Sequence, residues 1–218
     1  MPPKKKPIPK QFKLPKKIAV FPLPNIILFP QIEIPLFIFE PRYREMLKDI
    51  LRGNKFMAIS LLRKGWQTQK EPYPSHEIVG VGYVKAVIEN PDGTSHILLK
   101  GLERARIVRY LQNEPYRVAL VRMLPDEIKN QKELSQLAQV LRQLFIQKLK
   151  LASEKPSDKF LLPKELVNPL TLSHYVSFTA SLDPYLKQDI LETVNANCRM
   201  KHLISLLQEE ICPPGIQN

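Results

Sequence analysis

The 218-residue sequence contains only seven glycines, and this shortage excludes the nucleotide-binding loops that depend on them. A phosphate loop of the GxxxxGK type followed by Ser or Thr does not occur, so nothing indicates nucleotide hydrolysis. Gly80 and Gly82 form a GxG, but Lys85 stands where a dinucleotide fingerprint has its third glycine. We therefore interpret these two glycines as positions where backbone packs closely or the sheet coils.

Cysteine is also scarce, since Cys198 and Cys212 are the only two and neither lies in a CxxC. Two isolated cysteines cannot form the disulfide framework of a small secreted protein, and they suit a reducing compartment. No export signal with a small-residue cleavage site is recognisable, so we expect a cytoplasmic protein. Cys198 lies beside apolar residues on a predicted helix, which favours a buried structural thiol over a nucleophile.

The sequence lacks the motifs of metal sites and of hydrolytic enzymes. Its four histidines, at 76, 96, 174 and 202, show neither HxH nor HExxH spacing, and no GxSxG occurs. We therefore predict no metal site, no cofactor and no catalytic residue. An independent peptidase activity stays open as the weakest of the functional hypotheses, because no nucleophile and base pair is recognisable.

The stretch from Ile18 to Phe39 is nearly free of charge and follows a lysine-rich start, which is the outline of a membrane anchor. Its 22 residues would suffice for a spanning helix, which needs about 20. However, four prolines interrupt it, and each proline in a helix interior costs about 3 kcal/mol. Glu33 would add about 2.5 kcal/mol or more at a bilayer centre. The sequence therefore predicts buried, extended chain instead of a membrane helix.

The net charge of +12 is concentrated at the start of the chain. Residues 1–17 hold seven of the 33 basic residues and no acid, which leaves 26 bases against 21 acids in the remainder. A segment so rich in Pro and Lys is expected to be disordered, and it serves either as a solubilising arm or as a non-specific contact for RNA, DNA or acidic surfaces. The lysines concerned are Lys4, Lys5, Lys6, Lys10, Lys13, Lys16 and Lys17.

The first half of the folded chain has the pattern of short β-strands with one early helix. A helix is predicted over 41–54, with Pro41 in the first turn and Gly53 as its stop. The NPDG sequence at 90–93 predicts a hairpin turn. The expected strands are 17–23, 34–40, 55–62, 78–89, 94–102, 104–111 and 116–124. Strands at this spacing predict a small, twisted, mostly antiparallel sheet that closes into a barrel.

The second half has the period of amphipathic helices. Leucines, Ala138 and Phe145 recur at i, i+3, i+4 and i+7 between 133 and 151, the pattern of one buried face. Thr171 is expected to cap a helix over 172–182, and Asp183, followed by Pro184, to cap the next one. A last helix is predicted over 195–211, before two prolines stop it.

Aromatic and proline residues gather between positions 21 and 43, close in sequence to two arginines. Most of them are expected to fill the barrel core, but some could form an apolar groove together with the polar loop at 63–77. Arginine beside aromatic residues is common in interaction sites. The candidate peptide-binding residues are Phe21, Pro22, Phe29, Pro30, Phe37, Phe39, Arg42, Tyr43 and Trp66.

Three ordered motifs resemble one family. The sequences "FPLPNIILFPQIEIPLFIFEPRYREML", "VGVGYVKAVIENPDGTSHILLKGLERARI" and "DILETVNANCRMKHLISLLQEEI" are similar to the N-terminal, substrate-binding domain of Lon protease. The resemblance covers about residues 18–212 and is strongest to the form found in small standalone bacterial proteins. It implies an α+β fold, in which a PUA-like β-barrel over 18–124 precedes a helical bundle over 125–212, with tails at 1–17 and 213–218.

The resemblance also implies a role without catalysis. In full Lon proteases separate modules hydrolyse ATP and cut peptide bonds, and no position of this sequence matches their catalytic motifs. The first functional hypothesis is therefore a module that binds unfolded or extended polypeptide, or an adaptor to a protease or chaperone in protein quality control. The alternative is an RNA-binding PUA-like module assisted by the basic tail.

Overall fold

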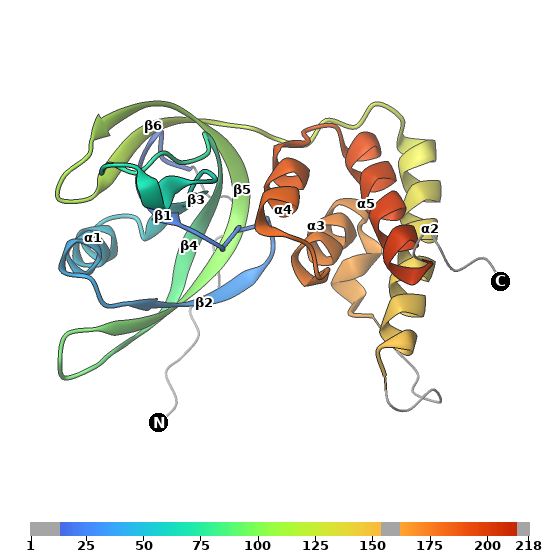
Figure 1. Ribbon diagram of the computed structural model, residues 1–218, viewed down its shortest axis with the longest axis horizontal. Coiled ribbons are helices and arrows are strands. Elements are labelled where there is room, and N and C mark those ends of the chain that lie inside the picture. Colours follow the sequence, from blue (N-terminus) through green and yellow to red (C-terminus); the bar gives the residue numbers. More distant parts are fainter. Residues whose placement is uncertain (1–13, 154–161, 213–218) are drawn as a thin grey trace.

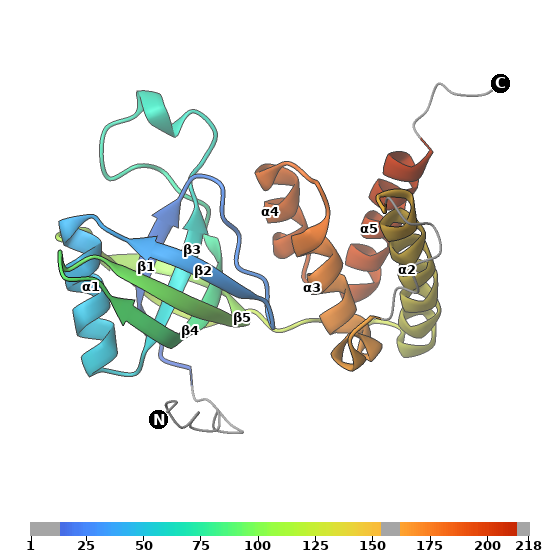
Figure 2. The same ribbon diagram turned by 90° about the horizontal axis from the view of Figure 1, so that it is seen from below.

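The computed structural model describes residues 14–153 and 162–212 and has two halves that lie side by side. Figures 1 and 2 show the strands and α1 in one half and α2 to α5 in the other. The first half is a mixed sheet of six strands and the second is helical, which confirms the predicted α+β class with a barrel before a bundle. No helix in these two ranges combines the length and hydropathy that a bilayer crossing requires.

The sheet has the order β2-β5-β4-β3-β1-β6, and an additional pairing of β5 with β6 closes it. All neighbours are antiparallel except β1 and β3, which run parallel, so the prediction of a mostly antiparallel sheet is confirmed. The strands are β1 (Lys17–Leu23), β2 (Glu33–Ile38), β3 (Phe56–Leu61), β4 (Ile78–Glu89), β5 (Ser95–Gln112) and β6 (Arg117–Met123).

β5 is one strand of 18 residues where two strands had been expected. Its first part pairs with β2 and β4, and its second part pairs with β4 and β6. Register shifts in both pairings mark bulges, which bend a strand without ending it. The interruption expected near Glu103 is therefore a bend in a continuous strand, since no turn-forming residue follows the glycine at 101.

The apolar stretch between β1 and β2 crosses the sheet where β4 and β5 carry glycines. A Cβ atom at Gly80 would lie 1.9 Å from the carbonyl oxygen of Leu28, and one at Gly101 would lie 2.1 Å from that of Phe29. The backbone of Gly101 also bonds with both Gln31 and Ile32. This confirms that Gly80 marks close backbone packing, and it explains why so much apolar chain is buried without forming a membrane helix.

Each helix of the second half begins at a side chain that accepts a backbone N–H. Asp183 caps its helix as predicted, whereas the cap expected at Thr171 is wrong, because Asn168 accepts from the N–H groups of Leu170 and Thr171 and Pro169 occupies the first helical position. The helices are α1 (Pro41–Arg52), α2 (Gln131–Leu151), α3 (Pro169–Thr179), α4 (Pro184–Glu192) and α5 (Ala196–Ile211), with 3₁₀ turns at Trp66–Thr68 and Lys164–Val167.

One apolar core runs through both halves of the molecule. It includes Phe29 and Leu99 of the sheet half together with Leu141 and Leu203 of the helices. A second cluster contains strand residues only, at alternate positions that include Val20, Ala58 and Val81, and the closed part of the sheet buries them against one another. The inward face of α5 carries Met200, Leu203 and Leu207. Cys198, two positions before Met200, is exposed, so the prediction of a buried thiol is wrong.

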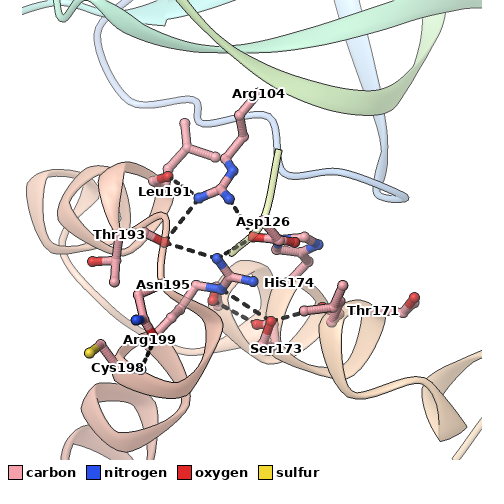
Figure 3. A network of polar contacts seen from close by, with 12 residues as sticks. Arg104, Asp126, Thr171, Ser173, His174, Leu191, Thr193, Asn195, Cys198 and Arg199 are labelled. Carbon is pink, nitrogen blue, oxygen red and sulfur yellow. Dashed lines mark hydrogen bonds and ion pairs between the residues drawn. The ribbon is translucent and has the colours of Figure 1, made fainter. Parts of the chain in front are cut away.

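A buried polar network, which we call the junction, joins the two halves (Figure 3). Arg104 of β5 and Arg199 of α5 are each 1% exposed, and both donate to the carboxylate of Asp126. Arg104 also donates to the carbonyl oxygens of Leu191 and Thr193, 2.8 and 3.0 Å away, at the end of α4. A cation at a helix C-terminus is stabilising, so Arg104 of the barrel stabilises the C-terminal end of α4 in the bundle.

The electrostatics of the junction follow from its burial. Burial alone would raise the pKa of Asp126, but Arg199 and Arg104 outweigh it and hold the pKa below its ordinary value. Burial, aided by Arg199, lowers the pKa of His174 in α3 to about 3. His174 is therefore neutral at pH 7, and the junction holds two positive charges against one negative charge.

Candidate functional site

Four of the predicted peptide-binding residues are part of the core. Phe29 is 0% exposed, Phe21 and Tyr43 are 6% exposed, and Pro30 is also buried. The rings of Phe21 and Tyr43 lie 4.4 Å apart, centroid to centroid, where α1 packs on β1. In this conformation Phe21, Phe29 and Pro30 belong to the core, and Tyr43 both packs on Phe21 and lines the pocket described below.

Phe37 and Phe39 lie on the surface, with 46% and 59% of their area exposed. Phe37 stands opposite His96 of β5, and His96 stands opposite Ile88 of β4, which is 68% exposed. The Phe37 ring stacks on His96 at 4.6 Å and on Phe39 at 5.8 Å. We call Phe37, Phe39, Ile88 and His96 the aromatic ladder. A contiguous exposed apolar group of this kind marks interaction sites.

The ladder lies at an edge of the sheet. β2 pairs only with β5 among the described strands, so its second side is not covered by another strand. Pro35 lies in the middle of β2 and is exposed, as expected for an edge strand, where a missing N–H group costs no ladder hydrogen bond. An edge strand beside exposed aromatic residues is the arrangement that accepts an extended peptide as an added strand.

The remaining predicted residues surround a small pocket on another part of the surface. Pro22 and Arg42 line a cavity of about 80 Å³ together with Tyr43, Glu71–Tyr73 and Asn113–Arg117. Arg42 donates to Glu40 at 3.0 Å and to both carboxylate oxygens of Glu71. Trp66 does not line this pocket, but its ring packs edge-on against Tyr73, 5.1 Å away. The loop at 63–77 therefore contributes one wall.

The surroundings of two tyrosines in this pocket raise the pKa of their phenol groups. Burial raises the pKa of Tyr43, and Arg42 acts in the opposite direction. Burial also raises the pKa of Tyr116 to about 12, assisted by the hydrogen bond that its hydroxyl donates to Asp49 at 2.7 Å. Both phenols are therefore neutral donors at pH 7.

The lysine set is only partly described. Lys16 and Lys17 are exposed, and Lys17, the last residue of the expected tail, is the first residue of β1. The Lys16 carbonyl accepts the N–H of Val121, so the strand pairing begins there. Lys4, Lys5, Lys6, Lys10 and Lys13 lie outside the described residues.

The junction contains Ser173, His174 and Asp126, the residue types of a hydrolytic triad, but their geometry is structural. The Ser173 hydroxyl donates to the Leu170 carbonyl at 2.8 Å and accepts from Arg199 at 3.2 Å. His174 Nε2 lies 3.8 Å from Asp126 Oδ2, and both Ser173 and His174 are at most 4% exposed. A nucleophile needs a hydrogen-bonded base and access to substrate, which this serine lacks. Within the described ranges no cluster of His, Cys, Asp and Glu could hold a metal.

Sequence reasoning had identified Phe37 and Phe39 but had missed the other half of the ladder and much of the pocket. Ile88 stands opposite His96 because Glu89 pairs with Ser95 across a five-residue connection, whereas pairing about the predicted turn at 90–93 would have placed Ile88 opposite Ser95. Arg117, which is 7% exposed, gave no signal in the sequence, because a strand arginine is ordinarily taken as solvent-facing.

Comparisons with known proteins agree on one family. Residues 17–209 match the model of the ATP-dependent protease La (Lon) substrate-binding domain. A Lon protease of Dictyoglomus thermophilum is 25% identical over 200 residues, which cover 91% of this chain and 25% of that protein. A Lon protease of Azospirillum brasilense is also 25% identical, over 203 residues, 92% of this chain and 25% of that protein. The chain thus spans about a quarter of the length of these relatives.

Solved structures show the same fold. The N-terminal domain of a Mycobacterium avium complex Lon protease aligns with a TM-score of 0.68 at 16% identity, and covers 89% of this chain and 99% of that one. A Lon N-terminal domain protein from Xanthomonas campestris aligns with a TM-score of 0.62 at 18% identity, over 87% and 97%. The matched residues include the whole sheet and almost all of α5, so the chain belongs to the Lon protease substrate-binding domain family.

Proposed function

We propose that this protein binds unfolded or extended polypeptide through the aromatic ladder, and that it acts in the cytoplasm as a non-catalytic adaptor in protein quality control. The ladder is the observation that carries the proposal. Membership in a family named for substrate binding supports it, since an exposed polypeptide segment is the kind of substrate that apolar surface would hold.

The chemistry of the ladder suits such a ligand. Unfolded chains expose aromatic and aliphatic side chains that folded proteins bury, and these pack on large, rigid aromatic surfaces. The side of β2 that no described strand covers adds backbone groups, other than the N–H that Pro35 lacks, that can bond with an extended chain. Together they give affinity for extended apolar segments with little dependence on the exact sequence.

The test is binding of a fluorescently labelled, casein-type unfolded polypeptide to the full chain and to a Phe37→Ser/Phe39→Ser variant, followed by anisotropy. We expect the dissociation constant to rise by about tenfold or more, since loss of exposed aromatic anchors costs an interface at least about 1.4 kcal/mol. Val167→Ser is the matched control, because Val167 is 70% exposed and lies in the helical half.

Equal affinity of the ladder variant and the control variant would refute the proposal. Labelled RNA is measured in parallel at several salt concentrations, since phosphate contacts give a steep salt dependence. RNA binding that survives removal of residues 1–13, without polypeptide binding, would favour the alternative of an RNA-binding module.

A further inference from the structure

We propose that the pocket between α1 and the β5–β6 connection binds a carboxylate of the polypeptide, with Arg117 as its ligand. This inference rests on the proposed function, which identifies the ligand as a polypeptide. It adds a charged contact at the pocket to the apolar contact at the aromatic ladder. The carboxylate comes either from the end of a chain or from an Asp or Glu side chain.

Arg117 differs from the other deeply buried arginines in its partners. Arg104 and Arg199 share the carboxylate of Asp126, whereas no ion pair among the described residues involves Arg117. Arg117 donates only to neutral oxygens, the Ser75 hydroxyl at 3.2 Å and the Tyr73 carbonyl, and lies over the ring of Tyr110. Buried charges are ordinarily paired, so Arg117, a residue that is 7% exposed, lacks the anion that would normally accompany it.

The start of helix α1 forms another part of the pocket wall. The pocket includes Arg42 and Tyr43, the second and third residues of α1, and a helix start carries partial positive charge. Glu40 precedes the helix but does not cap it, because its carboxylate bonds to Arg42. The first-turn N–H groups of α1 therefore have no side-chain cap, and the Glu40 carboxylate stays paired with Arg42.

The carboxylates near the pocket do not take the place of a ligand. Both oxygens of Glu71 accept from Arg42, which fixes this ion pair as part of the wall. Glu114 lines the rim and is exposed, so it repels a second carboxylate only through solvent. With Glu40, which also bonds to Arg42, these acids outnumber the two arginines of the pocket, so we expect free anions to bind there only weakly.

The volume of the cavity limits its ligand to a small chemical group. Pockets for drug-sized molecules span about 300–1,000 Å³, whereas this one measures about 80 Å³. That space accommodates a terminal carboxylate or one short acidic side chain. A charge-assisted bond from a largely buried arginine to such a group would be among the stronger single contacts that a polypeptide could make.

The experiment follows amide resonances of the ¹⁵N-labelled full chain during titration with N-acetyl-phenylalanine and, separately, its amide. We expect shifts at Tyr43, Asn113 and Arg117 with the carboxylate only. In parallel, a 12-residue aromatic peptide is compared in three forms: a free C-terminus, an amidated C-terminus, and an amidated form with one internal Glu. Preference for the first form identifies a chain end, and preference for the third identifies a side chain.

Three variants locate the effect. Arg117→Gln should remove the preference for the carboxylate, about tenfold or more, while Arg109→Gln, which removes an exposed charge from β5, should leave it intact. Should Arg117→Gln fail to fold, Asn113→Trp blocks the exposed rim without touching the core and should remove the preference equally.

The two proposals fail in different ways. No carboxylate-dependent shift in the pocket, with polypeptide binding still dependent on the ladder, overturns the carboxylate site and leaves the proposed function standing. Carboxylate-dependent shifts at Tyr43, Asn113 and Arg117, with no contribution of the ladder to polypeptide binding, overturn the proposed function and leave the carboxylate site.

Discussion

Charged residues are usually exposed and apolar residues usually buried, but the junction buries charged side chains and the aromatic ladder exposes apolar ones. At the junction two buried arginines hold a partly buried aspartate, and in the ladder two phenylalanines and an isoleucine are exposed. Each guanidinium of the junction donates to Asp126 and to at least one carbonyl oxygen, although Arg199 Nη2 and His174 Nε2 are buried without a hydrogen-bond partner among the described residues. Among the described residues, the exposed rings of Phe37 and Phe39 stack on each other, and Phe37 also stacks on His96. Buried charges that are paired with each other within the fold contribute to stability. Exposed aromatic residues that no other element covers indicate a binding partner.

Asp126→Asn should have the largest effect on stability. It leaves Arg104 and Arg199 buried without a counter-charge, and breaking such a pair costs about 3–5 kcal/mol. Urea unfolding measures the loss. Glu127→Gln changes the exposed neighbouring residue and should stay within about 0.5 kcal/mol of the wild type. Equal stability of the two variants would mean that the junction does not hold the halves together.

His174 should make the junction sensitive to acid. Its pKa of about 3 in the folded state lies below the ordinary value of 6.5, so the unfolded chain binds the proton first. This contribution to stability is complete above about pH 6.5 and is lost as the pH falls toward 3. Between pH 6 and 4 the wild type should lose roughly 2.5 kcal/mol more than His174→Gln, whose side chain does not titrate. Parallel pH profiles of unfolding for the two proteins would contradict this.

Ile88→Ser should separate binding from stability at the ladder. The side chain is 68% exposed, so its loss should change the free energy of unfolding by no more than about 0.5 kcal/mol. Polypeptide binding should weaken by about threefold to tenfold, measured by anisotropy as above. A destabilised variant with unchanged binding would show that the ladder stabilises the fold, as the junction does, and does not bind polypeptide.

Glu33→Gln should have the smallest effect and tests β2 outside the ladder. Glu33 accepts from Lys85 at 2.7 Å, and both side chains are about one-third exposed. A pair of this kind contributes at most about 0.5 kcal/mol, measured by thermal unfolding at low and high salt. Binding of unfolded polypeptide should not change, since the ladder is intact. A loss of binding as large as that of Ile88→Ser would show that charge on β2, and not its aromatic face, holds the ligand.

Local patterns predicted much of the fold. The strand at 78–89 and the capping of α4 by Asp183 followed from apolar runs and from cap chemistry, which depend on neighbours in sequence. The continuity of β5 did not, because a bulge replaces a turn only when two partner strands require it. The carboxylate of Asp126 between two arginines joins residues 22 and 73 positions apart, a distance over which no local pattern operates.

The sequence alone determined the family, the order of barrel and bundle, and the aromatic segment that contains the candidate surface. Only the tertiary structure decided which aromatic residues face outward. Residues 34–39 are apolar at every position, so the alternation of a strand gives no indication of which face is buried. Leu36 and Ile38 are buried and Phe37 and Phe39 are exposed because the rest of the fold covers one face of β2 and leaves the other uncovered.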